Sequence, residues 1–432
     1  MKAKRRISNL LANLGLLIVS LLLVELGLHA ASVFLADIDR VTRPPCGHDD
    51  KSVSPVIDDD RLGMRGNPEW RDHDARGFRN LSALGNSAIV ALGDSHTYGS
   101  SVKTDEPWPS RLSVLLGEDV YNMGLGGYGP AHNAENLSTA MALEPKLVIF
   151  GLYLGNDFYD DFEFAKRNDL IAEYADKDVL QRISELEKRQ TLGDEIGFLF
   201  RSGREAERAS PTQKPSTEPQ RANVLTDAGE WLSCHSRLYG LARTTKKQIG
   251  SYFEDTNALL ARDFDRAREK LSDWQSAYVS AYDGPTWKTI FTSPYRLRTL
   301  DDADPRIRTG IEISKQMIGQ MHRRVTEAGA KFVVLFLPTK EYVFWPRVGN
   351  PDEHKALADL VRHEDRIRDE IKEYLRERRV DFIDPVPDLR EAGRQPYFPD
   401  GDGHPNAFGH EIIAEKVFEV IEANPDLRIV SQ

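Results

Sequence analysis

The sequence has little cysteine and, beyond its first residues, no concentration of positive charge. Only Cys46 and Cys234 occur among 432 residues, and two cysteines so far apart do not make a zinc site. They leave open either a disulfide or two free thiols. The formal charge is -11, from 57 basic and 68 acidic residues. No basic stripe follows the first few residues, which argues against nucleic acid as the main partner.

The N-terminus differs from everything that follows it. Four basic residues stand near the start of the chain: Lys2, Lys4, Arg5 and Arg6. They precede an apolar stretch over about residues 10–35, interrupted mainly by Asn13, Glu25 and His29. This order predicts a single-pass transmembrane anchor over residues 1–36, with the rest of the chain outside the cytoplasm. The small residues in "HAAS" also fit a cleaved signal peptide, and Glu25 is costly at membrane depth.

Five short apolar runs are predicted to be strands: "SAIVALGDS", "EDVYNMGLGGYGP", "KLVIFGLYLGND", "KFVVLFLP" and "VDFID". Helical patterns lie between them, including one with Ile313, Met317, Ile318, Met321 and Val325 and one with Leu357, Leu360, Ile367, Ile371 and Leu375. A last helix is expected from about Asn406 to Glu422. Alternation of strand and helix favours an α/β fold with a parallel five-stranded sheet between two helical layers, a flavodoxin-like three-layer α/β/α arrangement.

The expected domains follow from this pattern. Residues 37–85 form a linker and the N-terminal edge, residues 86–157 and 306–432 form the α/β domain, and residues 158–305 form a mostly helical insertion. The segment "ASPTQKPSTEPQRA" in the insertion is expected to be disordered, and a helix is expected from about Thr256 to Asp283. Its aromatic residues either line a binding cleft or serve packing: Trp231, Tyr239, Trp274, Tyr278 and Trp287.

Candidate functional residues follow the first three predicted strands. Ser95 follows the first, Gly127 lies in the glycine turn after the second, and Asn156 follows the third. Ligands of open parallel sheets bind at the carboxyl ends of the strands. A reactive serine needs hydrogen-bond donors for the oxyanion that it creates, and a glycine N–H and an asparagine amide supply them. Near the C-terminus, His404 in "YFPDGDGHPN" could act as the base.

Four blocks, "GDSHTYG", "NMGLGG", "GND" and "DGHPN", resemble those of the SGNH hydrolases, also called GDSL-type lipases and esterases. The resemblance covers roughly residues 86–157 and 330–422. It implies that Ser95 is the nucleophile and His404 the general base. It also implies that the oxyanion is bound by Asn156 and by the N–H groups of Gly127 and Ser95. No metal or organic cofactor is implied.

The residue that orients His404 departs from the family pattern, which places an acid three residues before the histidine. That position is Gly401 here. Asp402, two residues before, matches related polysaccharide O-acetyltransferases, and Asp400 is the alternative. The "GDSH" block, which contains His96, resembles the same block in SGNH domains that move acetyl groups on cell-surface glycans. The favoured interpretation is that His96 caps the helix that follows, and it is assigned no catalytic role.

Together these features predict a membrane-anchored serine esterase or O-acyltransferase with a Ser-His-Asp triad, facing the periplasm. Its expected substrate is an acyl ester, such as an O-acetyl group on a cell-envelope carbohydrate. The alternative is a catalytically silent protein of envelope polysaccharide assembly or carbohydrate binding. Oligomeric state, acyl chain length and the natural substrate stay open.

Overall fold

The computed structural model describes residues 13, 15–16, 19–31, 53–70, 72–80, 83–208, 236–238, 241, 256–269, 278–348 and 354–428. The chain divides into two compact units. One comprises residues 1–53 with 212–259, and the other comprises residues 54–211 with 260–432. Cys46 and Cys234 lie outside the described residues, as do Trp231, Tyr239 and Trp274.

The first unit contains a helix over residues 19–31. Glu25 lies in this helix, and its carboxylate accepts hydrogen bonds from the Ser236 hydroxyl at 3.0 Å and from the main-chain N–H groups of Arg237 and Leu238 at 2.6 and 2.9 Å. The residue that interrupts the apolar run therefore has polar partners within its own unit. No helix in the described part of the chain is both long and apolar enough to cross a membrane.

The second unit is built on the five predicted strands, and all five are confirmed. They are β3 (Ile89–Leu92), β4 (Val120–Asn122), β5 (Leu147–Tyr153), β8 (Lys331–Leu337) and β9 (Asp381–Ile383). Every neighbouring pair is parallel, and the order across the sheet is β4-β3-β5-β8-β9. This is the flavodoxin-like order, in which the topological switch point lies beside the first strand, β3.

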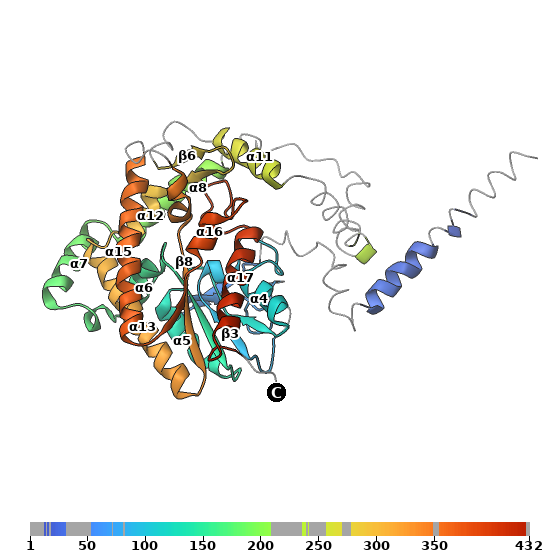
Figure 1. Cartoon of the computed structure of the whole chain (residues 1–432), viewed down its shortest axis with the longest axis horizontal. Helices are drawn as coiled ribbons and strands as arrows, with labels where there is room; N and C mark the ends of the chain where they lie inside the picture. The colour runs from blue at the N-terminus through green and yellow to red at the C-terminus, as the bar shows by residue number, and fades with distance from the viewer. Residues whose placement is uncertain are drawn as a thin grey trace, which may run out of the picture. The chain divides into compact units, whose positions relative to one another are not determined.

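Helices cover both faces of this sheet (Figure 1). On one face α4 (Trp108–Leu116) packs against α17 (Ala407–Ala423), and on the other α13 (Pro305–Glu327) packs against α5 (Pro130–Met141) and α6 (Asp157–Arg167). The helix α15 (Lys355–Glu377) lies on the same side as α13. The apolar positions that predicted α15 are all buried, as are those of α13 apart from the partly buried Met317. Burial of these faces is the main favourable contribution to folding.

The helix α6 belongs to the body of this unit although it falls in the predicted insertion. Phe158 and Phe162 are fully buried in the main core. A Cβ at Gly310 of α13 would lie 1.9 Å from the Phe158 carbonyl oxygen, so the two helices approach closely because Gly310 has no side chain. The third strand of the sheet is therefore followed by a helix that is fixed against α13.

The described residues form further elements. They are the antiparallel hairpin β1 (Val56–Asp59) and β2 (Gly63–Gly66), α3 (Ser95–Tyr98), η1 (Ile171–Glu173), α7 (Lys177–Arg189), α8 (Leu192–Arg208), α11 (Thr256–Glu269), the antiparallel hairpin β6 (Ser280–Asp283) and β7 (Lys288–Phe291), α12 (Ser293–Thr299), α14 (Lys340–Phe344), η3 (Trp345–Arg347) and α16 (Val386–Glu391).

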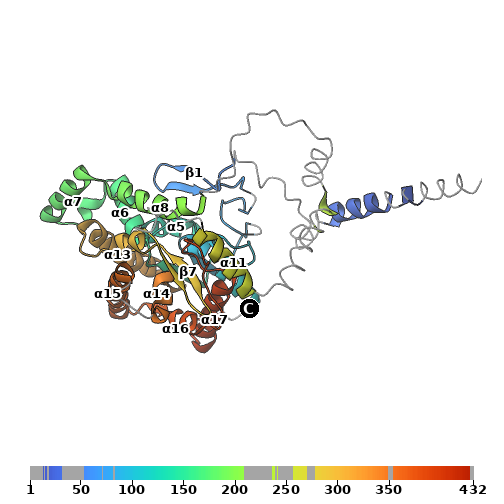
Figure 2. The same cartoon turned by 90° about the horizontal axis from the view of Figure 1, so that it is seen from above.

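The expected helix from Thr256 to Asp283 is wrong at its C-terminal end. The helix α11 ends at Glu269, and residues 280–283 form the strand β6. Burial alternates along β6 because it pairs with β7, a period of two that does not fit a helix. Figure 2 shows α11 beside β7, and Phe264 of α11 packs there with Val279 and Ile290.

Candidate active site

Ser95 lies at the carboxyl end of β3, in a turn that requires the residues before it. Gly93 has φ +152°, and a Cβ there would lie 2.2 Å from Thr97 Oγ1. Asp94 caps α3, because its carboxylate accepts the His96 N–H at 2.9 Å. The Gly93 N–H is in turn held by Asn133 Oδ1 at 3.0 Å. The Gly-Asp-Ser sequence therefore fixes a sharp turn that presents Ser95 at the first position of a helix.

Ser95, His404 and Asp402 form one hydrogen-bonded chain. Ser95 Oγ lies 2.8 Å from His404 Nε2, and His404 Nδ1 is hydrogen-bonded to Asp402 Oδ1. With the Nδ1 proton donated to the carboxylate, Nε2 is free to accept the Ser95 hydroxyl proton. Asp402 Oδ2 accepts a further hydrogen bond from Ser101 Oγ at 2.6 Å.

The electrostatics of Asp402 favour its charged form. Burial by itself raises the pKa of this carboxyl group, but the hydrogen bonds from the His404 ring, from Ser101 and from the His404 N–H hold the pKa well below its ordinary value. Asp402 is therefore a carboxylate at neutral pH. A negative charge at this point favours the protonated form of His404 that arises when the ring accepts a proton.

Asp400 does not reach the histidine ring in this arrangement. Its Oδ1 accepts the main-chain N–H of Asp402 at 3.0 Å, which stabilises the turn before the histidine. Of the two carboxylates that the sequence left open, the structure thus brings Asp402 to His404 and places Asp400 in the supporting turn.

A buried lysine also holds the loop that carries Asp400, Asp402 and His404. Lys340 follows β8 at the carboxyl edge of the sheet and is fully buried. Its Nζ donates to the main-chain carbonyl oxygens of Asp400 at 2.6 Å, Asp402 at 2.8 Å and Phe398 at 3.4 Å. Burial lowers the pKa of Lys340, and the nearby carboxylates oppose this shift only in part. The loop that carries Asp402 and His404 is therefore tied to the end of a central strand.

The glycine turn after β4 lies beside Ser95. A Cβ at Gly126 would be 3.7 Å from Ser95 Cβ. Gly127 has φ +79°, a left-handed conformation that favours glycine, and a Cβ there would meet Met64 Cε at 2.7 Å. The Leu125 N–H donates to the Gly93 carbonyl oxygen at 3.2 Å, which joins this turn to the one that carries Ser95.

Asn156 is the N-cap of α6, directly after β5. Its side-chain amide donates one hydrogen bond to Asp160 Oδ2 at 2.5 Å, which fixes the orientation of the amide. An amide nitrogen carries two protons, so one remains for a ligand. Burial and the charge of Asp94 raise the pKa of Asp160 to about 7, although the Asn156 hydrogen bond opposes the shift.

His96 is a buried neighbour of the site. Its ring is 1% exposed, stacks on Tyr153 with 3.6 Å between ring centroids, and lies 4.7 Å from the His404 ring. Its Nδ1 is 3.3 Å from Asp94 Oδ2. Burial lowers the pKa of His96 to about 4, so the ring is neutral at pH 7. The His96 ring packs next to the His404 ring. Among the described residues it forms no hydrogen bond with Ser95 Oγ.

A small pocket lies beside His404. Its lining residues come from α8, from α12 and the residue before it, and from the loop that carries His404: Leu199, Phe200, Thr292, Tyr295, Arg296, Gly401, Asp402, Gly403 and His404. Trp287, one of the aromatic residues that the sequence suggested either for a binding cleft or for packing, does not line this pocket. Its ring centroid lies 4.8 Å from that of Phe344, and the residue is 1% exposed.

Several residues of the site were not identified from the sequence. Lys340 follows a predicted strand at the edge of the sheet where Ser95 and Asn156 lie. Its position in the sequence therefore indicates that it lies near the site. Ser101 and Arg296 carry no such signal, because one lies in a loop after a very short helix and the other in the region treated as an insertion.

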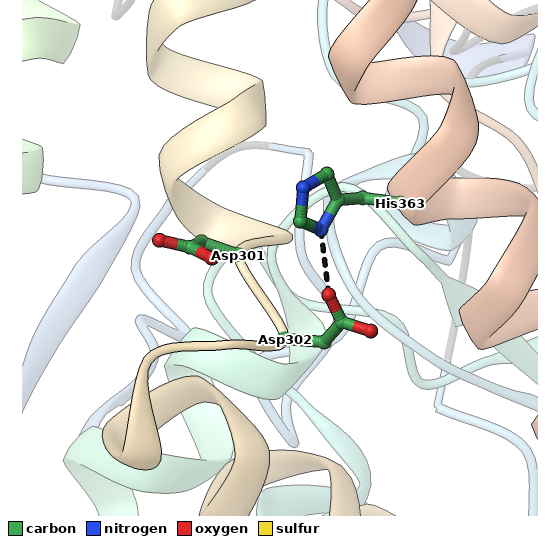
Figure 3. Close-up of side chains that lie close together, drawn as sticks. All are labelled: Asp301, Asp302 and His363. Atoms are coloured by element: carbon green, nitrogen blue, oxygen red, sulfur yellow. Dashed lines mark hydrogen bonds and ion pairs between the residues drawn. The ribbon is translucent and has the colours of Figure 1, made fainter.

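Three side chains of types that can bind a metal ion lie close together (Figure 3). In the described part of the chain, Asp301, Asp302 and His363 form the one group of this kind. His363 Nδ1 bonds Asp302 at 2.6 Å, and the Arg366 guanidinium donates to the same carboxylate at 2.7 Å. A guanidinium in this position supplies the positive charge that a cation would bring, so the cluster is an ion-pair network.

No protein-family model and no curated protein sequence match this chain. The chain is similar to several solved structures. A member of the lipolytic protein G-D-S-L family from Veillonella parvula is 12% identical over 78% of this chain and 98% of its own, with a TM-score of 0.30.

An extracellular lipase from Streptomyces rimosus is 11% identical over 78% of this chain and 98% of its own, with a TM-score of 0.36. A carbohydrate acetylesterase from Sinorhizobium meliloti is 11% identical over 78% of this chain and 99% of its own, with a TM-score of 0.31. Likeness at this level carries no weight for function, which rests on the chain's own residues.

Proposed function

We propose that this protein is a serine esterase or O-acyltransferase of the SGNH type. The observation that carries the proposal is the hydrogen-bonded chain from Ser95 Oγ through His404 to Asp402, with 2.8 Å between Ser95 Oγ and His404 Nε2. Its place at the carboxyl edge of a parallel sheet, at the topological switch point, supports a binding site there. The four sequence blocks that resemble the SGNH hydrolases contain the same residues.

The reaction begins when His404 Nε2 takes the hydroxyl proton of Ser95 and Oγ attacks the carbonyl carbon of an ester. Negative charge develops on the carbonyl oxygen, and the N–H groups of Ser95 and Gly127 and the free amide proton of Asn156 are its donors. The tetrahedral intermediate collapses when the C–O bond to the alcohol breaks, and the alcohol oxygen receives the proton from His404 Nε2.

The product of this first half is an ester between the acyl group and Ser95. A second hydroxyl then enters, gives its proton to His404 and attacks the acyl carbon, and Ser95 leaves with a proton again. Water as the entering group gives hydrolysis, and a sugar hydroxyl gives transfer. The same residues serve both outcomes, which differ in how well water is excluded from the acyl-enzyme.

We place the reaction on an O-acetyl group of a cell-envelope carbohydrate. The "GDSH" block and the two-residue spacing between Asp402 and His404 support this substrate class. The proposal includes the N-terminal anchor and a periplasmic position for the α/β unit, supported by the basic residues ahead of the apolar run. A mature N-terminus at or near Met1 in membrane-extracted protein is the expected result, and one near Ala31 would mean cleavage.

The experiment is an assay of the purified chain with 4-nitrophenyl acetate and with an acetylated glycan, measuring both released acetate and acetate transferred to a second glycan. We expect turnover of 4-nitrophenyl acetate by the wild type and none above background by Ser95→Ala. Equal activity of the two proteins would contradict the proposal. The ratio of transferred to released acetate then assigns the reaction to transfer or to hydrolysis.

A further inference from the structure

One cation in the pocket beside the triad is buried without a hydrogen-bonding partner. Arg296 of α12 is 7% exposed and lines the pocket together with His404. Its Nε has no hydrogen-bond partner, and within the described ranges its guanidinium forms neither a hydrogen bond nor an ion pair. Arginine carries five N–H donors in a planar fork, and burial of such a group without acceptors is costly.

The guanidinium is held in place by rings and by a glycine. Its central carbon lies 4.6 Å from the ring centroid of Tyr295 and 5.2 Å from that of Tyr153. A Cβ at Gly403 would lie 2.6 Å from an Arg296 terminal nitrogen, so the fork rests against the main chain between Asp402 and His404. Cation–π contacts position the charge and leave its N–H donors unused.

The carboxylates nearest to this charge already have donors of their own. Asp402 accepts hydrogen bonds from His404 and Ser101. Glu341 Oε1 accepts the Thr292 N–H at 3.1 Å, and its buried Oε2 has no hydrogen-bond partner among the described residues. Neither lies within ion-pair distance of Arg296, although both charges raise its pKa. In the described part of the chain Arg296 therefore has no carboxylate within ion-pair distance, but the negative charges of Glu341 and Asp402 act on it. A ligand with a single negative charge suits such a site better than a doubly charged phosphate.

We propose that Arg296 binds a carboxylate of the substrate next to the ester that Ser95 attacks. This inference rests on the proposed function and narrows its substrate to an acidic ester. The carboxylate belongs either to the sugar, as in an O-acetylated uronic acid, or to the acyl group, as in a hemisuccinate. The side of the pocket formed by Leu199 and Phe200, the latter 38% exposed, offers apolar surface for the uncharged part of the substrate.

The test compares acidic and neutral esters. The two sugar substrates are O-acetylated methyl glucuronoside and O-acetylated methyl glucoside, and the two acyl substrates are 4-nitrophenyl hemisuccinate and 4-nitrophenyl acetate. In the wild type we expect kcat/KM to favour the acidic member of one pair by about 10- to 100-fold, the usual effect of a hydrogen-bonded charge pair in a desolvated site. The pair that shows the preference identifies the source of the carboxylate.

Arg296→Gln should bring that ratio to about 1, and Arg296→Lys should restore it in part because an ammonium keeps the charge and loses the fork. Arg362→Gln is the matched control, since Arg362 is exposed on α15 and pairs only with Asp359 in the described contacts. It should keep the wild-type ratio. No acidic preference in either pair, or a preference that survives Arg296→Gln, would overturn the inference.

A binding measurement separates this inference from the proposed function. Calorimetric titration with methyl glucuronoside and with monomethyl succinate, which each carry one carboxylate, needs no turnover. If 4-nitrophenyl acetate is not hydrolysed at all, the proposed function fails. Binding of either acidic probe to the wild type, and its loss in Arg296→Gln, would still support the carboxylate site, and absence of binding to the wild type would refute it.

Discussion

Replacement of Asp402 by asparagine tests the geometry of the triad most severely. The substitution keeps the size of the side chain and removes the charge that favours protonated His404. An asparagine amide that donates to Nδ1 would also leave the Nε2 position with the proton, the wrong tautomer for accepting the Ser95 proton. The corresponding change in a serine protease triad costs about 10,000-fold in kcat.

The structure sets the magnitude to expect here. The Asp402 side chain is 12% exposed and its second oxygen is held by Ser101, so water has little room to replace the lost charge. We therefore expect Asp402→Asn to lower kcat by about 1,000- to 10,000-fold. Asp400→Asn should lower kcat by less than about tenfold, because an amide oxygen can still accept the Asp402 N–H.

The assay is steady-state hydrolysis of 4-nitrophenyl acetate by wild type and both variants, with thermal unfolding as the check on folding. The Asp400→Asn protein is the matched control, since it changes the same chemistry two residues away. A larger loss in Asp400→Asn than in Asp402→Asn would refute the triad of Ser95, His404 and Asp402. Small losses in both would mean that Ser95 and His404 act without a dedicated carboxylate.

Three further outcomes follow from the same contacts. Asn156→Ala removes a proposed oxyanion donor and should lower kcat by about 100- to 1,000-fold with little change in KM. An effect on KM alone would place Asn156 in substrate binding. Lys340→Met removes the hydrogen bonds that tie the loop of Asp402 and His404 to the end of β8. It should lower kcat about 100-fold, as a displacement near 1 Å can. Unchanged kcat would show that the loop holds its position without the lysine. Burial lowers the pKa of His96 to about 4 and that of His132 to about 3. The stability that their neutral forms contribute is therefore complete above about pH 6.5 and is lost as the pH falls toward those values. The free energy of unfolding should decrease by up to about 1.4 kcal/mol per pH unit for each histidine. Urea unfolding at pH 7 and pH 4.5 should show this loss, and it should shrink in His96→Gln; a loss of equal size in the variant would contradict the assignment to His96.

The sequence predicts the framework well because its signals are local. Strand β3 is a short apolar run that ends in a turn requiring Gly93, and α17 begins where Asn406 caps it by accepting the N–H groups of Phe408 and Gly409. Both signals lie within a few residues of the feature that they predict. The edge at which Ser95, Asn156 and His404 meet follows from the parallel order of the strands.

The parts that the sequence does not predict depend on distant contacts. Arg296 reaches the pocket through the packing of α12, and no spacing relates it to Ser95. The strand β6 forms because it pairs with β7 and packs near Phe264, although the residues before it fit a helical pattern. The choice between Asp402 and Asp400 also needs three-dimensional geometry, since both are close enough in sequence to reach the His404 ring.

The central claim is that Ser95 becomes covalently acylated, and its most direct test is mass spectrometry of the protein after labelling. The wild-type chain is treated with a fluorophosphonate probe and digested, and the modified residue is located; Ser95→Ala is treated in parallel. We predict one adduct on Ser95 in the wild type and none in the variant, with the adduct also strongly reduced in a His404→Ala protein. A labelled residue other than Ser95, or equal labelling of wild type and Ser95→Ala, would contradict the claim.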